Sequence, residues 1–116
     1  MPPSSHLPLL DKTLGLQLIA AGASISMTAK LLRVTETTAR QFRRTIASAA
    51  AEGLRPGEAV RQTFVAAYGV DDEQAWQAAR AAASTLLLER VGELPAGRGR
   101  PADLGEIVDA MMAEGA

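Results

Sequence analysis

The stretch TAKLLRVTETTARQFRR, residues 28–44, decides the fold that we expect for this chain. Its pattern predicts a short helix that ends near Leu32, a break, and a second helix that Thr35 caps and that runs to about Ala51. On a wheel of about 100° per residue, one side of the second helix collects Thr35, Ala39, Phe42, Ile46 and Ala49. The opposite side is centred on Thr37, Arg40 and Arg44, with Glu36, Gln41 and Arg43 beside them. One face of this helix is therefore expected to be buried and the other exposed.

The exposed face carries guanidinium, amide and hydroxyl groups, which read base edges in the major groove of DNA and hold phosphates. We expect Arg40 and Arg44 to read bases, with Thr37 and Gln41 assisting. The other candidate DNA-binding residues, which we expect to contact mainly phosphates, are Lys30, Arg33 and Arg43. An alternative is an amphipathic helical hairpin whose arginine face is only solvated, since motifs of this kind produce false matches.

The residues before this helix fit the DNA-binding interpretation. Ala29 is small where two helices cross closely, Val34 fills the turn, and Ala39 meets the preceding helix across the crossing. This spacing resembles the helix-turn-helix of many bacterial regulators. Arg33 occupies the turn position that glycine usually holds. Either Arg33 adopts a left-handed conformation at some cost, or the turn has another shape.

Residues 10–46, LDKTLGLQLIAAGASISMTAKLLRVTETTARQFRRTI, resemble the N-terminal part of the flagellar transcriptional activator FlhC. In that family a helix of the type QLAxELIxLGA precedes the helix-turn-helix, and LGLQLIAAGASISM takes its place here. The resemblance covers about a third of the chain. It implies a regulator that binds promoter DNA, works with a partner subunit and recruits RNA polymerase. It also implies DNA contact by the helix that holds Thr37, Arg40, Gln41, Arg43 and Arg44.

Composition indicates an all-α protein with about six helices. Of the 116 residues, 47% are hydrophobic but only 3% are aromatic. The core must therefore be aliphatic and rich in alanine, which favours helices. The predicted organisation is a flexible tail over residues 1–8, a helix-turn-helix domain with oligomerisation helices over 9–92, a linker over 93–101 and a C-terminal helix over 102–116.

Local signals give the expected bounds of the remaining helices. Asp11 is the expected N-cap of the first helix, which Gly22 stops, and Ser26 is the expected cap of the second. A fourth helix is expected over residues 57–68, with Gly69 ending it. Asp71 and Asp72 are expected to open a fifth helix that runs to about Val91, and a last helix is expected over 102–113.

Charge is distributed unevenly, although the net charge is only -1. Between Lys30 and Arg61 there are seven bases and three acids, whereas from Asp71 onward there are nine acids and four arginines. The first region can attract an anionic polymer that the second repels.

The sequence GRGRP, residues 97–101, is a second basic element. It matches the core of an AT-hook, in which glycines allow close approach to the minor groove and arginines such as Arg98 and Arg100 enter it. We favour the alternative of a flexible linker with solubilising arginines, because a five-residue match arises easily by chance.

The sequence predicts no enzyme, no metal site and no cofactor. There is no cysteine, and the one histidine, His6, lies in the proline-rich tail. Asp103, Glu106 and Asp109 recur at helical spacing, and we interpret them as a solvated acidic face. No apolar stretch is long enough to span a bilayer and no signal peptide is evident, so we expect a soluble, cytoplasmic protein without a membrane partner. The resemblance to FlhC implies a bacterial one.

The fifth predicted helix indicates self-association. Leu86, Leu87 and Leu88 are consecutive and span most of its circumference, so the helix must be covered on more than one side. Either a second subunit covers it, giving a homodimer or larger oligomer, or it is a central helix wrapped by its own neighbours. The predicted function is an oligomeric, sequence-specific DNA-binding transcriptional regulator. The alternative is a helical protein–protein adaptor or anti-activator subunit of a larger assembly.

Overall fold

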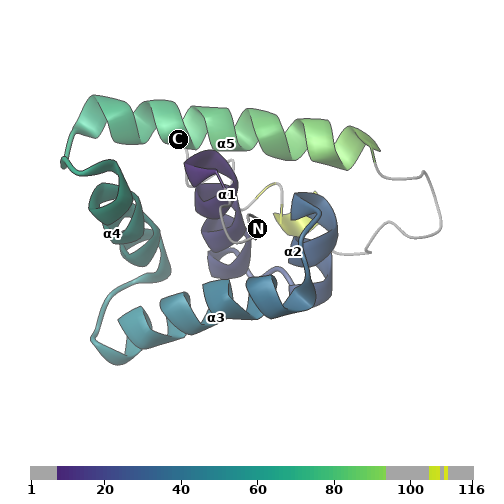
Figure 1. Ribbon diagram of the computed structural model, residues 1–116, viewed down its shortest axis with the longest axis horizontal. Coiled ribbons are helices and arrows are strands. Elements are labelled where there is room, and N and C mark those ends of the chain that lie inside the picture. The colour runs from purple at the N-terminus through teal and green to yellow at the C-terminus, as the bar shows by residue number, and fades with distance from the viewer. Residues whose placement is uncertain (1–7, 94–104, 108, 110–116) are drawn as a thin grey trace, which may run out of the picture.

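The computed structural model describes residues 8–93, 105–107 and 109, and all regular structure in this part of the chain is helical (Figure 1). The helices are α1 (Leu9–Ala20), α2 (Ile25–Leu32), α3 (Glu36–Ala51), α4 (Pro56–Tyr68) and α5 (Glu73–Glu93). The all-α prediction is confirmed. Residues 105–107 and 109 are also helical and belong to the expected last helix, most of which lies outside the described residues. None of the helices described is both long enough and apolar enough to cross a membrane.

α1 lies at the centre of the fold, framed by the other four helices (Figure 1). It contacts each of them, whereas the described residues of α3 and α5 make no contact with each other and lie on opposite sides of α1. Its sequence, LLDKTLGLQLIA, is apolar on most sides, as a helix covered all round requires. Leu14, Leu16 and Leu18 are almost completely buried. The central helix is therefore α1.

Within the chain α5 is covered on one side only, so it is not a central helix wrapped by its own neighbours. Leu87 is fully buried and Leu86 is half-buried, but Leu88 is 53% exposed. Trp76 and Ala83 lie on the buried side with Leu87. Consecutive leucines point in directions about 100° apart, so one neighbouring helix cannot cover all three.

Gly15 lets two helices approach the backbone of α1. A Cβ atom at Gly15 would lie 2.4 Å from Cε2 of Phe42 and 2.8 Å from Cδ1 of Leu32. Both distances are far below van der Waals contact. Because Gly15 has no side chain, Phe42 of α3 and Leu32 of α2 can both pack against the centre of α1. Phe42 is buried, as predicted.

The helix caps confirm some sequence predictions and correct others. Thr35 caps α3 as expected, its Oγ1 accepting from the Thr38 N–H at 3.2 Å. Ser24, not Ser26, caps α2, its Oγ accepting from the Met27 N–H at 3.0 Å. Pro8 stands at the N-cap of α1, so Asp11 lies within the first turn and is not a cap. Its carboxylate is instead engaged by a distant arginine, described below.

The starts of the last two long helices also differ slightly from expectation. α4 begins at Pro56, one residue before the expected start, because proline is well suited to the first turn of a helix. Gly69, with φ 99°, ends α4 as predicted. α5 begins at Glu73 rather than at Asp71, since Oδ1 of Asp72 accepts from the Gln74 N–H at 2.9 Å from just outside the helix. It continues to Glu93, two residues beyond the expected end.

Candidate nucleic-acid interface

The turn between α2 and α3 is left-handed at Arg33, with φ 58° and ψ 44°. Among the described residues Arg33 is the only one other than glycine with a positive φ. The Val34 N–H donates to the Ala29 carbonyl at 3.0 Å, which closes the end of α2 around this residue. Of the two alternatives expected from the sequence, the strained left-handed turn is the one adopted. A side chain in this conformation costs roughly 1–2 kcal/mol.

The two small residues that the sequence placed where α2 and α3 cross are both buried. Ala39 is fully buried and Ala29 nearly so. Val34 is half-buried beneath the turn and packs against the hydrophobic core. The inner face of α3 is thereby fixed, and the orientation of its outer face follows from it.

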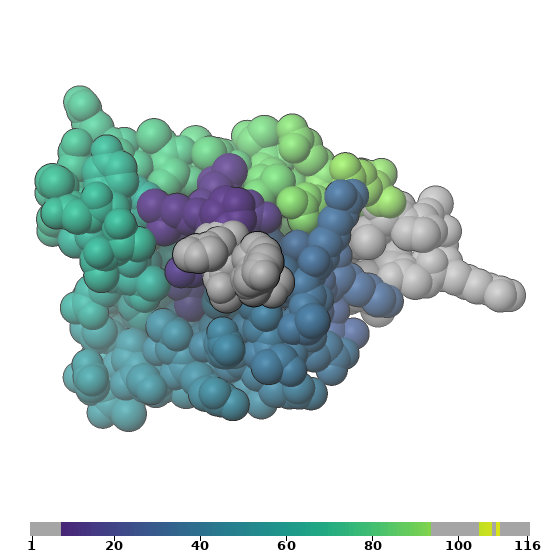
Figure 2. All heavy atoms as spheres, viewed as in Figure 1, coloured from purple at the N-terminus to yellow at the C-terminus, as the bar shows by residue number. Residues whose placement is uncertain are grey.

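The outer face of α3 is open to solvent along one edge of the molecule (Figure 2). The seven predicted DNA-binding residues are all exposed: Lys30, Arg33, Thr37, Arg40, Gln41, Arg43 and Arg44. Five of them lie on α3, Lys30 lies in the last turn of α2, and Arg33 lies in the turn between the two helices. Five of the seven therefore share α3, and Lys30 and Arg33 lie on the segment that leads into it, with the Arg33 side chain turned to Glu93 of α5.

The five cations of this region fall into two groups. Arg33 pairs with Glu93, the last residue of α5, and Arg40 pairs with Glu36, one turn earlier on α3, at 3.4 Å. Within the described residues Lys30, Arg43 and Arg44 make no ion pair. Three positive charges are therefore available to an anionic ligand without displacing a carboxylate.

A partly buried arginine of α5 holds the end of α2. Nη1 of Arg90 donates to the Leu31 carbonyl at 2.7 Å, and Nη2 lies 3.3 Å from Oδ2 of Asp11. The Arg90 and Asp11 side chains are only 17% and 15% exposed. The carbonyls of a last helical turn lack partners within the helix, and a cation there also suits the helix dipole. Arg90 thus fixes the position of α2 directly before the turn at Arg33.

This contact could not be predicted from local sequence, because the residues that make it lie far apart in the chain. Arg90 is 59 residues from Leu31 and 79 residues from Asp11. Asp11 in isolation is typical of a helix cap, and Arg90 in isolation is typical of a solvated surface. Only the packing of α5 across α1 and α2 brings them together.

A second charged cluster lies on α4, away from the outer face of α3. Arg61 bridges Asp71 at 3.0 Å and Glu73 at 2.6 Å. The hydrogen bond to Asp71, with that to Glu73, raises the pKa of Arg61. Hydrogen bonds from Gln77 and then Arg61 lower the pKa of Glu73. These groups satisfy one another and fasten the start of α5 to α4.

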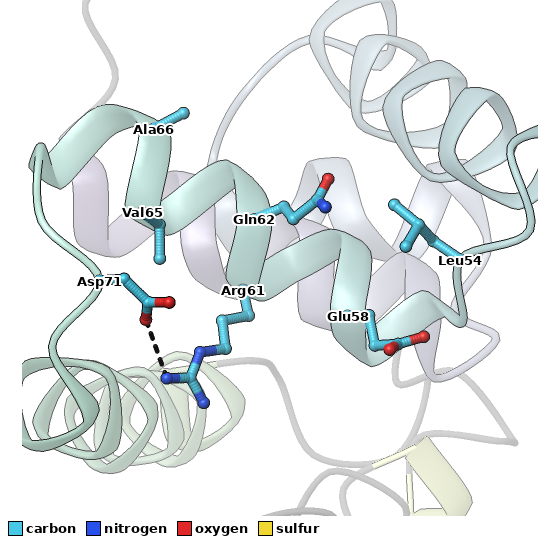
Figure 3. A pocket seen from close by; sticks show the side chains of 7 residues that line it. All are labelled: Leu54, Glu58, Arg61, Gln62, Val65, Ala66 and Asp71. Carbon is cyan, nitrogen blue, oxygen red and sulfur yellow. Dashed lines mark hydrogen bonds and ion pairs between the residues drawn. The ribbon is translucent and has the colours of Figure 1, made fainter.

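Beside this cluster is a groove of about 410 Å³ between the two loops that flank α4. Its apolar part is formed by Leu54, Val65 and Ala66. Figure 3 shows Arg61 reaching along its edge to Asp71. Of the charged groups on its rim, Arg61 and Asp71 are paired with each other and Glu58 accepts from the Arg55 N–H at 2.9 Å, so the groove offers little for recognition of a polar ligand.

The second basic element, Arg98 and Arg100, and the acidic residue Asp103 lie outside the described residues. Glu106 and Asp109 are exposed. Comparison of the chain with protein-family models, with curated proteins and with solved structures gives no match.

Proposed function

We propose that the chain is a DNA-binding transcriptional regulator in which α2, the turn and α3 act as a helix-turn-helix. The observation that carries this proposal is the outer face of α3, which exposes Arg40, Gln41 and Arg44 while Ala39 and Phe42 anchor its inner face. The major groove of B-DNA is about 12 Å wide and admits an α-helix. α3, with 16 residues, is about 24 Å long at 1.5 Å per residue, which suits an element that lies in that groove.

The side chains on this face divide between reading bases and holding the backbone. Arg40 and Arg44 are suited to the O6 and N7 acceptors of guanine, and Gln41 to the N6 and N7 groups of adenine. Lys30, Arg43 and Arg33 flank the reading residues, where contact with phosphates sets the register on the duplex. An adaptor that bound an acidic protein would need cations, but it would have no use for the Thr, Gln and Arg mixture that suits base edges.

The resemblance to FlhC regulators concerns the same segment and supports the same assignment. We propose no more from it than DNA contact by α3. Oligomer formation, a partner subunit and contact with RNA polymerase stay predictions from the sequence.

Selection of bound duplexes from a random DNA library tests the proposal. We expect the wild-type chain to enrich one motif, and we expect Arg44→Ala to lose preference at one position of it, by roughly 1–3 kcal/mol. Arg80→Ala is the matched control, since it removes the same charge from α5, on the opposite side of α1. Retention of the full motif by both Arg40→Ala and Arg44→Ala would favour the adaptor function instead.

The same measurement distinguishes the contribution of α3 to DNA binding from that of Arg98 and Arg100. We expect the double variant Arg98→Ala, Arg100→Ala to keep the preference for the motif over random DNA. If these arginines contact phosphates, binding to both DNAs weakens alike and the dependence on salt falls by about one charge per lost contact.

A further inference from the structure

Glu36 is an acid on a face that is otherwise basic. It is the first residue of α3 and the only acid in that helix. Its Oε1 lies 3.4 Å from Nη2 of Arg40, and both side chains are about half exposed. A carboxylate in the first turn of a helix gains roughly 0.3–1 kcal/mol from the helix dipole. That gain does not explain a carboxylate on a surface that would meet phosphates, which it repels.

The two side chains together present an acceptor beside a donor. The major-groove edge of a C·G base pair presents the complementary set, because N4 of cytosine donates and O6 of guanine accepts. These two base atoms are hydrogen-bonded to each other and therefore lie about 3 Å apart. The separation of the Glu36 and Arg40 tips, 3.4 Å, is close to that spacing.

We propose that Glu36 is a specificity-determining residue and that, with Arg40, it reads one C·G base pair; this inference rests on the proposed function. The Glu36 carboxylate accepts from N4 of cytosine and also holds one edge of the Arg40 guanidinium. The other N–H groups of Arg40 donate to O6 and N7 of guanine. An A·T pair also offers a donor beside an acceptor, but thymine carries a methyl group where guanine has N7. The pair therefore favours C·G.

Because three other cations of the face make no ion pair within the described residues, loss of Glu36 should affect binding to random DNA and discrimination between bases in opposite directions. Because Glu36 balances Arg40, the pair adds little to sequence-independent attraction, which falls to Lys30, Arg43 and Arg44. Removal of the carboxylate leaves an additional free cation on the face. It should therefore tighten binding to random DNA while weakening discrimination at one base pair.

Random-library selection and titration with Glu36→Ala test the inference, with Glu52→Ala as the matched control. Glu52 is exposed at the far end of α3, so its substitution makes the same change in charge away from the proposed base contact. We expect Glu36→Ala to lose about tenfold in preference for C·G at one position, a change of about 1.4 kcal/mol, and to bind random DNA more tightly. Glu52→Ala should keep the wild-type motif. The double variant Glu36→Ala, Arg40→Ala should discriminate no worse at that position than Arg40→Ala alone, since the two groups act as one unit.

The possible results separate this inference from the function on which it rests. A Glu36→Ala chain that enriches the wild-type motif with undiminished preference overturns the role of Glu36 and leaves the DNA-binding function standing. A wild-type chain that enriches no motif overturns the proposed function and the inference with it. Unfolding curves of the two single variants serve as a check, because loss of an exposed pair four residues apart on a helix should change stability only slightly.

Discussion

α3 and α5 rest on opposite sides of the same central helix, yet their outer faces have opposite character. Each is anchored by buried apolar side chains, Phe42 on α3 and Leu87 on α5. The outer face of α3 is crowded with arginines. Between residues 78 and 88 the exposed residues of α5 are uncharged, namely Ala78, Ala81, Ala82, Thr85 and Leu88, and the one charged side chain, Arg80, is half-buried over the Trp76 ring. Burial fixes which side of a helix faces inward, and only the outward residues distinguish the tasks of the two helices.

This arrangement has a geometric consequence for self-association. If two copies joined through the outer faces of α5, a two-fold axis would turn their α3 faces in opposite directions, because α3 and α5 lie on opposite sides of α1. Such a pair could not place both α3 helices on one side of the same duplex, as dimers that read palindromic sites do. We therefore expect each copy in a dimer of this kind to read a single, asymmetric site.

The largest effect on stability is expected at the buried side chains that hold α3 and α5 against α1, where the two helices are most alike. Phe42→Ala should lower the free energy of unfolding by roughly 3–5 kcal/mol and Leu87→Ala by roughly 2–5 kcal/mol, because both leave cavities against α1. Chemical denaturation measures both. A melting temperature unchanged by Phe42→Ala would mean that α3 is rotated relative to the structure, and the assignment of its outer face would fall with it.

How much of this structure can be predicted from the sequence depends on how far along the chain each structural signal acts. Thr35 and Gly69 act within a few residues of themselves, so their roles as cap and helix end could be predicted. Helical periodicity likewise predicted which side of α3 is buried. The central position of α1 and the close approach at Gly15 depend on which helices meet, and no single segment encodes that. The hydrogen bond from Arg90 to the end of α2 could not be predicted for the same reason.

A smaller effect is expected at Arg90, the residue through which α5 acts on the segment before α3. Arg90→Ala leaves the Leu31 carbonyl and the partly buried Asp11 carboxylate without their partner. Loss of hydrogen bonds that involve charged groups costs roughly 1.5–3 kcal/mol, and we expect a loss of stability in that range. Arg80→Ala, which removes a half-buried arginine elsewhere on α5, is the control. An unfolding curve of Arg90→Ala equal to that of the wild-type chain would show that the contact with α2 contributes nothing.

A still smaller effect on stability is expected at Leu88, on the uncharged face of α5. Since this side chain is largely exposed, Leu88→Lys should change the free energy of unfolding by no more than about 0.5 kcal/mol. If this face joins two copies, the wild-type chain should be a dimer by light scattering at tens of micromolar protein, where roughly −6 to −7 kcal/mol of binding free energy is sufficient. Leu88→Lys should then be a monomer, whereas Gln62→Lys, on the exposed side of α4, should stay dimeric. A monomeric wild type would leave the uncharged face of α5 without a role in self-association.

The smallest effect is expected at Glu73, where α5 begins. Hydrogen bonds from Gln77 and Arg61 lower the pKa of its carboxyl group in the folded chain. A carboxylate whose pKa is lower when folded stabilises the fold above its unfolded pKa, about 4.3 for glutamate, and loses that contribution as the pH falls through the folded pKa. The wild-type chain should therefore melt at a slightly higher temperature than Glu73→Gln at neutral pH, and the difference should shrink below about pH 4.

Because this contact lies at the start of α5 and away from α3, affinity for DNA at neutral pH should be the same for both chains. A difference in melting temperature that grows on acidification would contradict the assignment. A change in DNA affinity would show that the two sides of α1 are coupled more closely than their separate contacts suggest.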